Sequence, residues 1–149
     1  ATDELALAHE DLRELARGLH PAVLTERGLR AAVEVLAGRM PIPVETAGIP
    51  DERLPEPVEA AAYYLIAEAL TNVTKYARAS TVRIRLAASD GTVAVEVSDD
   101  GVGGADPASG TGLRGLADRV EALGGSLEVE SPIGAGTSLR AELPVEPGV

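Results

Sequence analysis

One stretch of the sequence places an acid, an amide and an amine at helical spacing. Residues 58–79 read VEAAAYYLIAEALTNVTKYARA, a pattern that predicts one long helix. At about 100° per residue, Glu68, Asn72 and Lys75 lie within roughly 60° of arc on one side of that helix. The apolar residues lie on the opposite side: Val58, Ala62, Ile66, Ala69, Leu70, Val73 and Ala77. A merely solvated face would carry several loose charges, so we interpret this polar stripe as a candidate site.

A second candidate lies downstream, where residues 97–103 read VSDDGVG. Asp99, at the end of a predicted strand, can accept a hydrogen bond from an exocyclic amine, and Gly101 and Gly103 let a ligand approach the backbone. Taken alone, Asp-Asp-Gly is more typical of a hairpin-like turn. Beside the polar stripe it indicates a magnesium–nucleotide complex, because magnesium prefers hard oxygen ligands and phosphates prefer cationic donors.

Two further glycine motifs are weaker by themselves. Residues 110–115 read GTGLRG and match G-x-G-x-x-G, but eleven residues separate them from the strand predicted to end at Ser98. A dinucleotide-binding turn follows its strand almost directly. We therefore interpret these glycines as a loop hinge that opens a helix N-terminus, where backbone N–H groups can meet phosphate. Gly134-x-Gly136-Thr137 enters the last predicted strand; a turn explains it, although the Thr137 hydroxyl could contact a base.

Composition restricts the classes of function. The length of 149 residues suits one domain, and the net charge of −11 has the wrong sign for nucleic acid or an anionic membrane, so a polyphosphate would need a local binding device. Lys75 is the only lysine among 13 basic residues, which indicates a requirement for a compact point charge. Cysteine is absent and His9 and His20 are the only histidines, so disulfides and a zinc site are not expected. The sequence shows no membrane-spanning run or signal peptide, and we expect a cytoplasmic domain.

The remaining patterns predict an α+β fold. Helices are expected at 3–19, 29–39 and 113–123, besides the long one, and strands at 42–46, 81–87, 92–98, 126–130 and 137–143. Asp90-Gly91 is typical of a hairpin, residues 50–57 of a turn, and residues 101–112 of a mobile loop. We therefore expect a two-layer α/β sandwich: a mixed, mostly antiparallel sheet of four or five strands, with helices on one face and charged residues on the other.

Taken in order along the chain, these pieces resemble the sequence boxes of the ATP-binding domain of sensor histidine kinases. Glu68-xxx-Asn72-xx-Lys75 resembles the N box, Asp99-x-Gly101-x-Gly103 the G1 box and Gly110-x-Gly112-Leu113 the G2 box. The resemblance covers residues 27–145, and LRGL, RV and LGG within residues 113–125 are similar to the nitrate-sensor subgroup with its DevS- and DesK-like relatives. It implies membership of the GHKL ATPase superfamily and a Bergerat-type ATP-binding fold.

The resemblance also implies roles for individual residues. Asn72 would coordinate Mg²⁺, Glu68 would hold a metal-bound water or act as a base, and Lys75 would contact the phosphates of ATP. Asp99 would bind the adenine amino group, with Thr137 in support. The other residues of the predicted nucleotide-binding set are Tyr76, where the family often has histidine, and the lid residues Gly101, Gly103, Gly110, Thr111, Gly112 and Leu113.

The family's phosphoacceptor histidine box is missing from the sequence. His20 is followed by Pro21, and the surroundings of His9 also depart from the box. We therefore interpret residues 1–20 as the end of a dimerisation-domain helix and residues 21–149 as the ATP-binding catalytic domain. Such a chain should be a monomer that binds Mg–ATP and shows little autophosphorylation. Its γ-phosphoryl group would go to a histidine on the separate dimerisation domain, for relay to a response regulator.

Two alternatives stay open on the sequence. A serine kinase of the anti-sigma-factor type shares the fold and the boxes, and its acid-stable phosphoserine would differ from acid-labile phosphohistidine. The other alternative is a non-catalytic nucleotide-sensing module. The presence of Glu68, Asn72 and Lys75 together argues against the sensing module, because a pure sensor need not keep a base.

Overall fold

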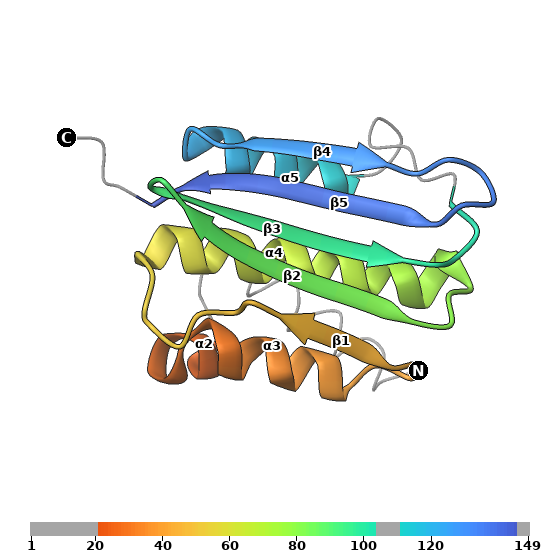
Figure 1. Ribbon diagram of the computed structural model, residues 1–149, viewed down its shortest axis with the longest axis horizontal. Helices are drawn as coiled ribbons and strands as arrows, with labels where there is room; N and C mark the ends of the chain where they lie inside the picture. Colours follow the sequence, from red (N-terminus) through yellow and green to blue (C-terminus); the bar gives the residue numbers. More distant parts are fainter. Residues whose placement is uncertain (1–20, 104–110, 146–149) are drawn as a thin grey trace, which may run out of the picture.

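The computed structural model describes residues 21–103 and 111–145, so the helix predicted at 3–19 lies outside the described residues. Five strands form one sheet in the order β1-β2-β3-β5-β4 (Figure 1). β1 (Val44–Ala47) runs parallel to β2 (Val82–Ser89). The other pairs are antiparallel: β2 with β3 (Thr92–Asp99), β3 with β5 (Thr137–Pro144), and β5 with β4 (Ser126–Glu130). The prediction of a mixed, mostly antiparallel sheet is confirmed.

The helical elements pack against one face of this sheet. They are α2 (Ala22–Arg27), α3 (Leu29–Gly38), α4 (Glu56–Asn72), the π-helical turn η1 (Val73–Ala77) and α5 (Thr111–Ala122). Figure 1 shows α4 and α5 behind the strands. The side of α4 that meets the sheet is buried and rich in alanine: Val58, Ala61, Ala62, Leu65, Ile66, Ala69 and Leu70. These small side chains allow the helix to lie close to the strands, and the core contains no Phe or Trp.

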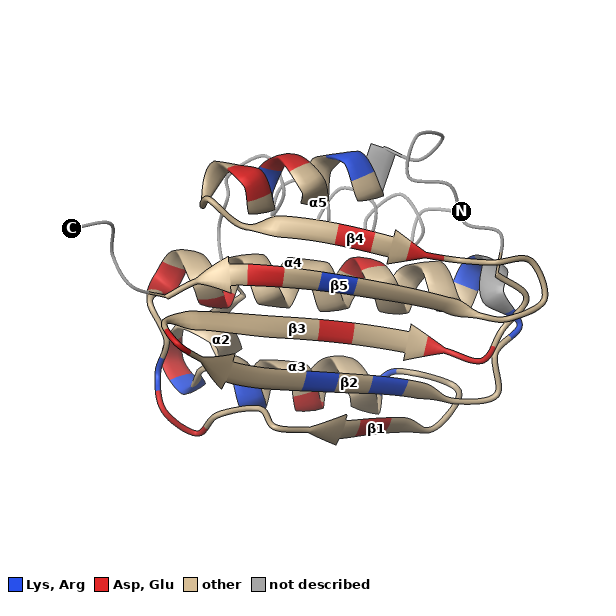
Figure 2. Cartoon of the chain, turned by 45° about the horizontal axis from the view of Figure 1, so that its top comes forward, with Lys and Arg blue, Asp and Glu red and all other residues tan. Residues whose placement is uncertain are grey.

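The two faces of the sheet follow the predicted alternation. The inward-facing residues of the central strands are buried: Val82, Ile84, Leu86, Val93, Val95, Val97, Leu139, Ala141 and Leu143. The outer face carries charges of both signs (Figure 2), and on it Arg83 Nε lies 3.4 Å from Glu45 Oε2. Asp90 and Gly91, with φ of 50° and 76°, form the predicted two-residue hairpin loop between β2 and β3.

The long helix predicted at 58–79 differs from the structure at its C-terminal end. It begins at Glu56 and is α-helical to Asn72, but the next five residues form a π turn. The turn ends at Arg78, whose backbone is left-handed with φ 49° and ψ 39°. A helical hydrophobic pattern does not distinguish an α-helix from one that widens in its last turn, and π turns are rare and often lie at functional sites.

The start of the described chain also differs from the prediction. α2 was not predicted, because the six residues between Pro21 and Gly28 are too few to show a helical period. Gly28, with φ 91°, ends α2 and separates it from α3. The first strand begins at Val44 rather than at residue 42.

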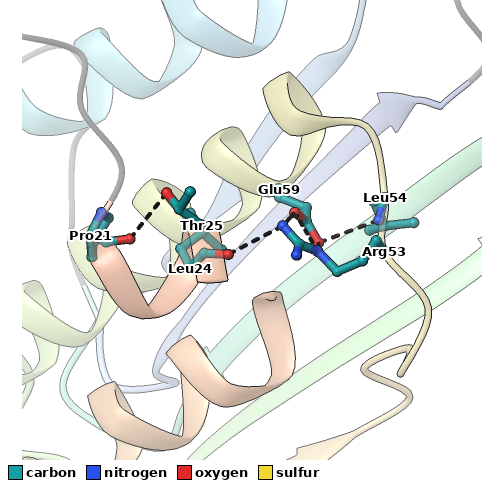
Figure 3. A network of polar contacts seen from close by, with 6 residues as sticks. All are labelled: Pro21, Leu24, Thr25, Arg53, Leu54 and Glu59. Carbon is teal, nitrogen blue, oxygen red and sulfur yellow. Dashed lines mark hydrogen bonds and ion pairs between the residues drawn. The ribbon is translucent and has the colours of Figure 1, made fainter. Parts of the chain in front are cut away.

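A buried carboxylate fixes the N-terminal half of α4 (Figure 3). The Glu59 side chain is only 3% exposed, and Arg53 donates to both of its carboxylate oxygens, with Nη2 2.9 Å from Oε1 and Nε 3.2 Å from Oε2. The Leu54 amide donates to Oε2 at 3.3 Å, and Arg53 Nη2 also donates to the Leu24 carbonyl at 3.3 Å. One ion pair therefore joins α2, the turn that precedes α4, and α4 itself.

Candidate functional site

The two candidate motifs of the sequence lie at the same end of the molecule. Figures 1 and 2 both show the C-terminal end of α4, the tip of the β3 arrow and the start of β5 together at this end. Glu68 and Asn72 are half-buried on α4, and Lys75 is exposed on η1. Asp99 is the last residue of β3 and pairs with Thr137, the first residue of β5. The fold thus gathers the residues predicted to bind the base and those predicted to bind the phosphates.

The π turn changes how Lys75 relates to the polar stripe. Two threonines donate hydroxyl hydrogen bonds to carbonyls four residues earlier, Thr71 to Ala67 at 2.9 Å and Thr74 to Leu70 at 3.0 Å. Such hydrogen bonds to carbonyls of the preceding turn slightly destabilise a helix and often bend it. The uniform spacing assumed for the sequence holds from Glu68 to Asn72, but Lys75 lies on a wider turn and trails the other two residues around the axis.

Asp99 is held in a partly desolvated position. Its Oδ1 accepts a hydrogen bond from the Gly101 amide at 2.8 Å. Burial raises the pKa of the Asp99 carboxyl, the amides of Gly101 and Thr137 lower it, and the nearby charge of Asp100 raises it; the net direction is upward. A half-buried carboxyl at a strand end is suited to bind a polar donor, because a ligand hydrogen bond would replace part of the solvation that burial removes.

Asp100, the neighbour of Asp99, has a structural role that the sequence did not indicate. Its Oδ1 accepts hydrogen bonds from the amides of Ser80 at 2.8 Å and Thr81 at 3.1 Å, and its Oδ2 accepts one from the Ser80 hydroxyl. The Ser80 hydroxyl, followed by the Thr81 and Ser80 amides, lowers the pKa of the Asp100 carboxyl. Asp100 therefore joins the segment that follows η1 to the end of β3, across about twenty residues of sequence.

Two glycines let the β4–β5 turn pack against the start of the predicted lid. A Cβ on Gly103 (φ 67°) would lie 2.0 Å from the Pro132 carbonyl oxygen, and one on Gly136 (φ 79°) would lie 2.1 Å from the Asp99 carbonyl oxygen. The Gly134 amide donates to the Val102 carbonyl at 2.6 Å. Gly134-x-Gly136 is thus more than an isolated turn, because it contacts the backbone that carries Asp99. No local pattern indicates such a contact between distant segments.

The remaining predicted residues divide into three groups. The Thr137 hydroxyl lies 2.6 Å from the Ser131 hydroxyl at the mouth of the β4–β5 turn. Leu113 is buried, 6% exposed, in the first part of α5, where it packs in the core. Gly110 lies outside the described residues, as do the side chains of Tyr76 and Thr111; Gly112 follows Thr111 in the backbone of α5.

The donor set near Asn72 suits a metal that brings most of its own ligands. Within residues 21–103 and 111–145, no group of three His, Cys, Asp or Glu side chains could hold a metal ion. Glu68 and Asn72 offer one carboxylate and one amide oxygen, and both are half-buried. Mg²⁺ keeps several waters and is held by one or two protein ligands plus substrate phosphates. These residues therefore fit Mg²⁺ that arrives with a polyphosphate, and not a metal held by protein alone.

Comparison with known proteins decides the family. Residues 58–147, more than half of the chain, match the profile described as "Histidine kinase-, DNA gyrase B-, and HSP90-like ATPase". The chain belongs to this ATPase family. In sensor histidine kinases this domain is the ATP-binding catalytic module, so ATP is its ligand.

Curated relatives of this ATPase domain are sensor kinases. The chain is 32% identical over 148 residues to the oxygen sensor histidine kinase NreB of Staphylococcus carnosus, and the alignment covers 91% of this chain and 42% of NreB. It is 34% identical over 149 residues to the sensor histidine kinase MctS of Rhizobium johnstonii, covering 92% of this chain and 32% of MctS. The chain thus spans less than half the length of these relatives.

Solved structures agree with this ATPase fold. The blue-light activated histidine kinase of Erythrobacter litoralis EL346 superimposes with a TM-score of 0.63 at 30% identity, covering 78% of this chain and 39% of that one. The histidine kinase AdeS of Acinetobacter baumannii, at 14% identity and a TM-score of 0.63, shares the fold. Among the helices of the described ranges, none combines the length and the apolar character needed to cross a bilayer.

Proposed function

We propose that this ATPase domain is the cytoplasmic catalytic part of a sensor histidine kinase, with residues 1–20 as the end of a dimerisation-domain helix and residues 21–149 as the catalytic domain. It would transfer the γ-phosphoryl group of ATP to a histidine of the dimerisation domain, from which a response regulator would receive it. The observation that carries this proposal is the family match together with the two sensor kinases that align over 91% and 92% of the chain.

The base of ATP would be bound at the end of β3. The Asp99 carboxyl would accept a hydrogen bond from the adenine amino group, with the Thr137 hydroxyl in support. The partial burial of Asp99 and its hydrogen bond from the Gly101 amide support this role, because carboxylate lone pairs remain for a ligand. The tight contact of Gly136 with the Asp99 backbone supports it further, since that contact limits how far the carboxyl can move.

The phosphates would be bound at the end of α4 and along η1. Lys75 would donate to phosphate oxygens, and Asn72 with Glu68 would hold Mg²⁺, directly or through water. Bound magnesium would neutralise phosphate charge in the transfer. The acceptor imidazole nitrogen would form a bond to the γ-phosphorus while the bond to the bridging oxygen breaks and ADP leaves. Glu68, on the same helix as Asn72, would accept the imidazole proton as the base.

The segment after Asp99 would cover the nucleotide as a lid. Gly101 and Gly103 would form its first hinge, and Gly110, Thr111 and Gly112 its second, next to the buried Leu113. The packing of Gly103 against Pro132 supports a fixed first hinge. The backbone N–H groups at the start of α5 would meet phosphate when the lid is closed, as helix N-termini commonly do. Tyr76, one residue after Lys75, would belong to the nucleotide-binding set, at the position where the family often has histidine.

Calorimetric titration with ATP in the presence and absence of Mg²⁺ tests the binding half of this proposal. We expect the wild-type chain to bind Mg–ATP and Asp99→Asn to bind it about tenfold or more weakly, because a neutral amide oxygen is a weaker acceptor than a carboxylate and the amide's NH₂ group faces the adenine donor or its neighbours unfavourably. Asp118→Asn, an exposed acid on α5, is the matched control and should bind as the wild type does. Undiminished binding by Asp99→Asn would remove the proposed adenine contact.

A phosphotransfer assay tests the catalytic half. The dimerisation domain encoded with this domain is supplied separately, with ATP labelled at the γ-phosphorus. We expect acid-labile label on that domain, and none when Asn72→Ala replaces the wild type. Acid-stable label would indicate a serine kinase, and ATP binding without transfer would indicate a sensing module.

A further inference from the structure

Arg78 occupies a backbone conformation that arginine rarely adopts. With φ 49° and ψ 39° it lies in the left-handed region, directly after the π turn that carries Lys75. Glycine and asparagine take this conformation at little cost, whereas a long side chain with a Cβ does so at a cost. Among the described residues, Asp90 is the other non-glycine with positive φ, and it lies in a hairpin loop where aspartate is ordinary.

Within residues 21–103 and 111–145, no described side chain pairs with Arg78. It is exposed and forms no salt bridge or side-chain hydrogen bond in the described part of the chain. By contrast, Arg30, Arg53 and Arg83 each pair with an acidic side chain. A cation at a helix C-terminus interacts favourably with the helix dipole, but arginine at an unstrained position would do the same.

The backbone around Arg78 is fixed at the nucleotide end of the molecule. Two residues later, the Ser80 amide and hydroxyl bond to Asp100, which directly follows Asp99. Three residues earlier lies Lys75, on the same π turn. Arg78 is thus held between the residue predicted to bind phosphate and the strand end predicted to bind adenine.

We infer that Arg78 is a second phosphate-binding cation of the ATP site, which contacts the β- and γ-phosphate oxygens beside Lys75. A guanidinium offers two parallel N–H donors to one phosphate, which a lysine ammonium cannot do. In a chain with net charge −11, a second local cation also offsets the repulsion that a triphosphate meets. The inference rests on the proposed ATP site and adds a residue to it that no sequence box contains.

Titration of Arg78→Asn with Mg–ATP and with adenosine tests this assignment. Asparagine tolerates the left-handed backbone, so we expect unchanged or higher thermal stability. We expect Mg–ATP to bind about five- to tenfold more weakly and adenosine to bind as in the wild type, because only phosphate contacts are lost. The affinity of Arg78→Lys for Mg–ATP should lie between those of the wild type and Arg78→Asn, since lysine keeps the charge and loses the paired donors.

Two controls separate the phosphate contact from charge and strain. Arg27→Asn removes a cation from the C-terminal end of α2, and Asp90→Asn changes the other described non-glycine residue with positive φ. Both should bind Mg–ATP as the wild type does. If Arg78→Asn binds Mg–ATP normally, or loses ATP and adenosine affinity equally, the assignment is overturned. If the wild type itself binds no ATP, the proposed function is contradicted. This result differs from both results that would overturn the Arg78 assignment alone.

Discussion

The carboxylate of Asp100 accepts a hydrogen bond from the Ser80 amide at 2.8 Å, and this bond connects the two halves of the proposed ATP site. Ser80 follows the π turn that carries Lys75, and Asp100 follows the carboxyl predicted to bind adenine. The two adjacent aspartates at the end of β3 therefore have different partners. Asp99 is partly buried beside Gly101, and Asp100 is exposed and fixes the neighbouring segment.

Asp100→Ala should weaken Mg–ATP binding about threefold to tenfold while adenosine binding changes little. The variant removes the acceptor for the Ser80 and Thr81 amides, so the segment that follows η1, the turn proposed to bind phosphate, becomes less fixed. Calorimetry with both ligands measures the difference. Ser80→Ala, which removes only the hydroxyl bond, should have a smaller effect. Equal affinities for wild type and Asp100→Ala would show that this connection does not position the site.

The two aspartates should affect stability against pH with opposite sign. The folded-state pKa of Asp99 is raised from 3.8, so above that pH the folded state binds more protons than the unfolded state and stability falls as pH rises. The pKa of Asp100 is lowered from 3.8, so its contribution is present above that value and is lost as pH falls through the folded-state pKa.

Urea unfolding of Asp99→Asn and Asp100→Asn across the acidic range checks these signs. Relative to the wild type, Asp99→Asn should gain stability as pH rises above 3.8. Asp100→Asn should lose stability relative to the wild type as the pH rises toward 3.8. Parallel curves for the two variants would contradict the assignment of burial to one carboxyl and hydrogen bonding to the other.

The sequence predicted best what depends on local periodicity. β4 was predicted with its observed bounds, Ser126–Glu130, because alternation between two glycine-rich segments leaves little freedom. The π turn at Val73 and the role of Asp100 were not predicted. The first leaves the hydrophobic pattern of the helix unchanged, and the second depends on hydrogen bonds between segments about twenty residues apart.

The glycines of the site illustrate the same division. Gly103 and Gly136 were interpreted as places where a ligand approaches the backbone or a turn forms. In the structure each is required by another backbone segment, with a carbonyl oxygen 2.0 Å or 2.1 Å from a would-be Cβ. A residue type alone does not tell which neighbour makes a glycine necessary.

Gly136→Ala should destabilise the fold by about 2 kcal/mol or more, because it adds left-handed strain to the collision with the Asp99 carbonyl. It should also weaken ATP binding, since the displaced backbone carries Asp99, the carboxyl proposed to bind adenine. Gly115→Ala is the matched control. Gly115 lies in α5, where an added Cβ would have nothing within 4 Å, so the variant should stabilise the fold by about 0.5–1 kcal/mol. Thermal unfolding of both variants gives the comparison. A Gly136→Ala protein as stable as the wild type would contradict the close approach.

Glu59→Ala should lower stability by about 2–3 kcal/mol and leave ATP affinity unchanged. The variant leaves Arg53 and the Leu54 amide without their buried acceptor, which releases α2 and the preceding turn from α4. Glu59 and Asn72 are separated by about 20 Å along the helix at 1.5 Å per residue, so the ATP site should not respond. Arg83→Ala, which breaks the exposed pair with Glu45, should cost at most about 1 kcal/mol. Urea unfolding and ATP titration of both variants measure the contrast. If Glu59→Ala loses more ATP binding than its fraction of unfolded protein explains, the two ends of α4 are coupled.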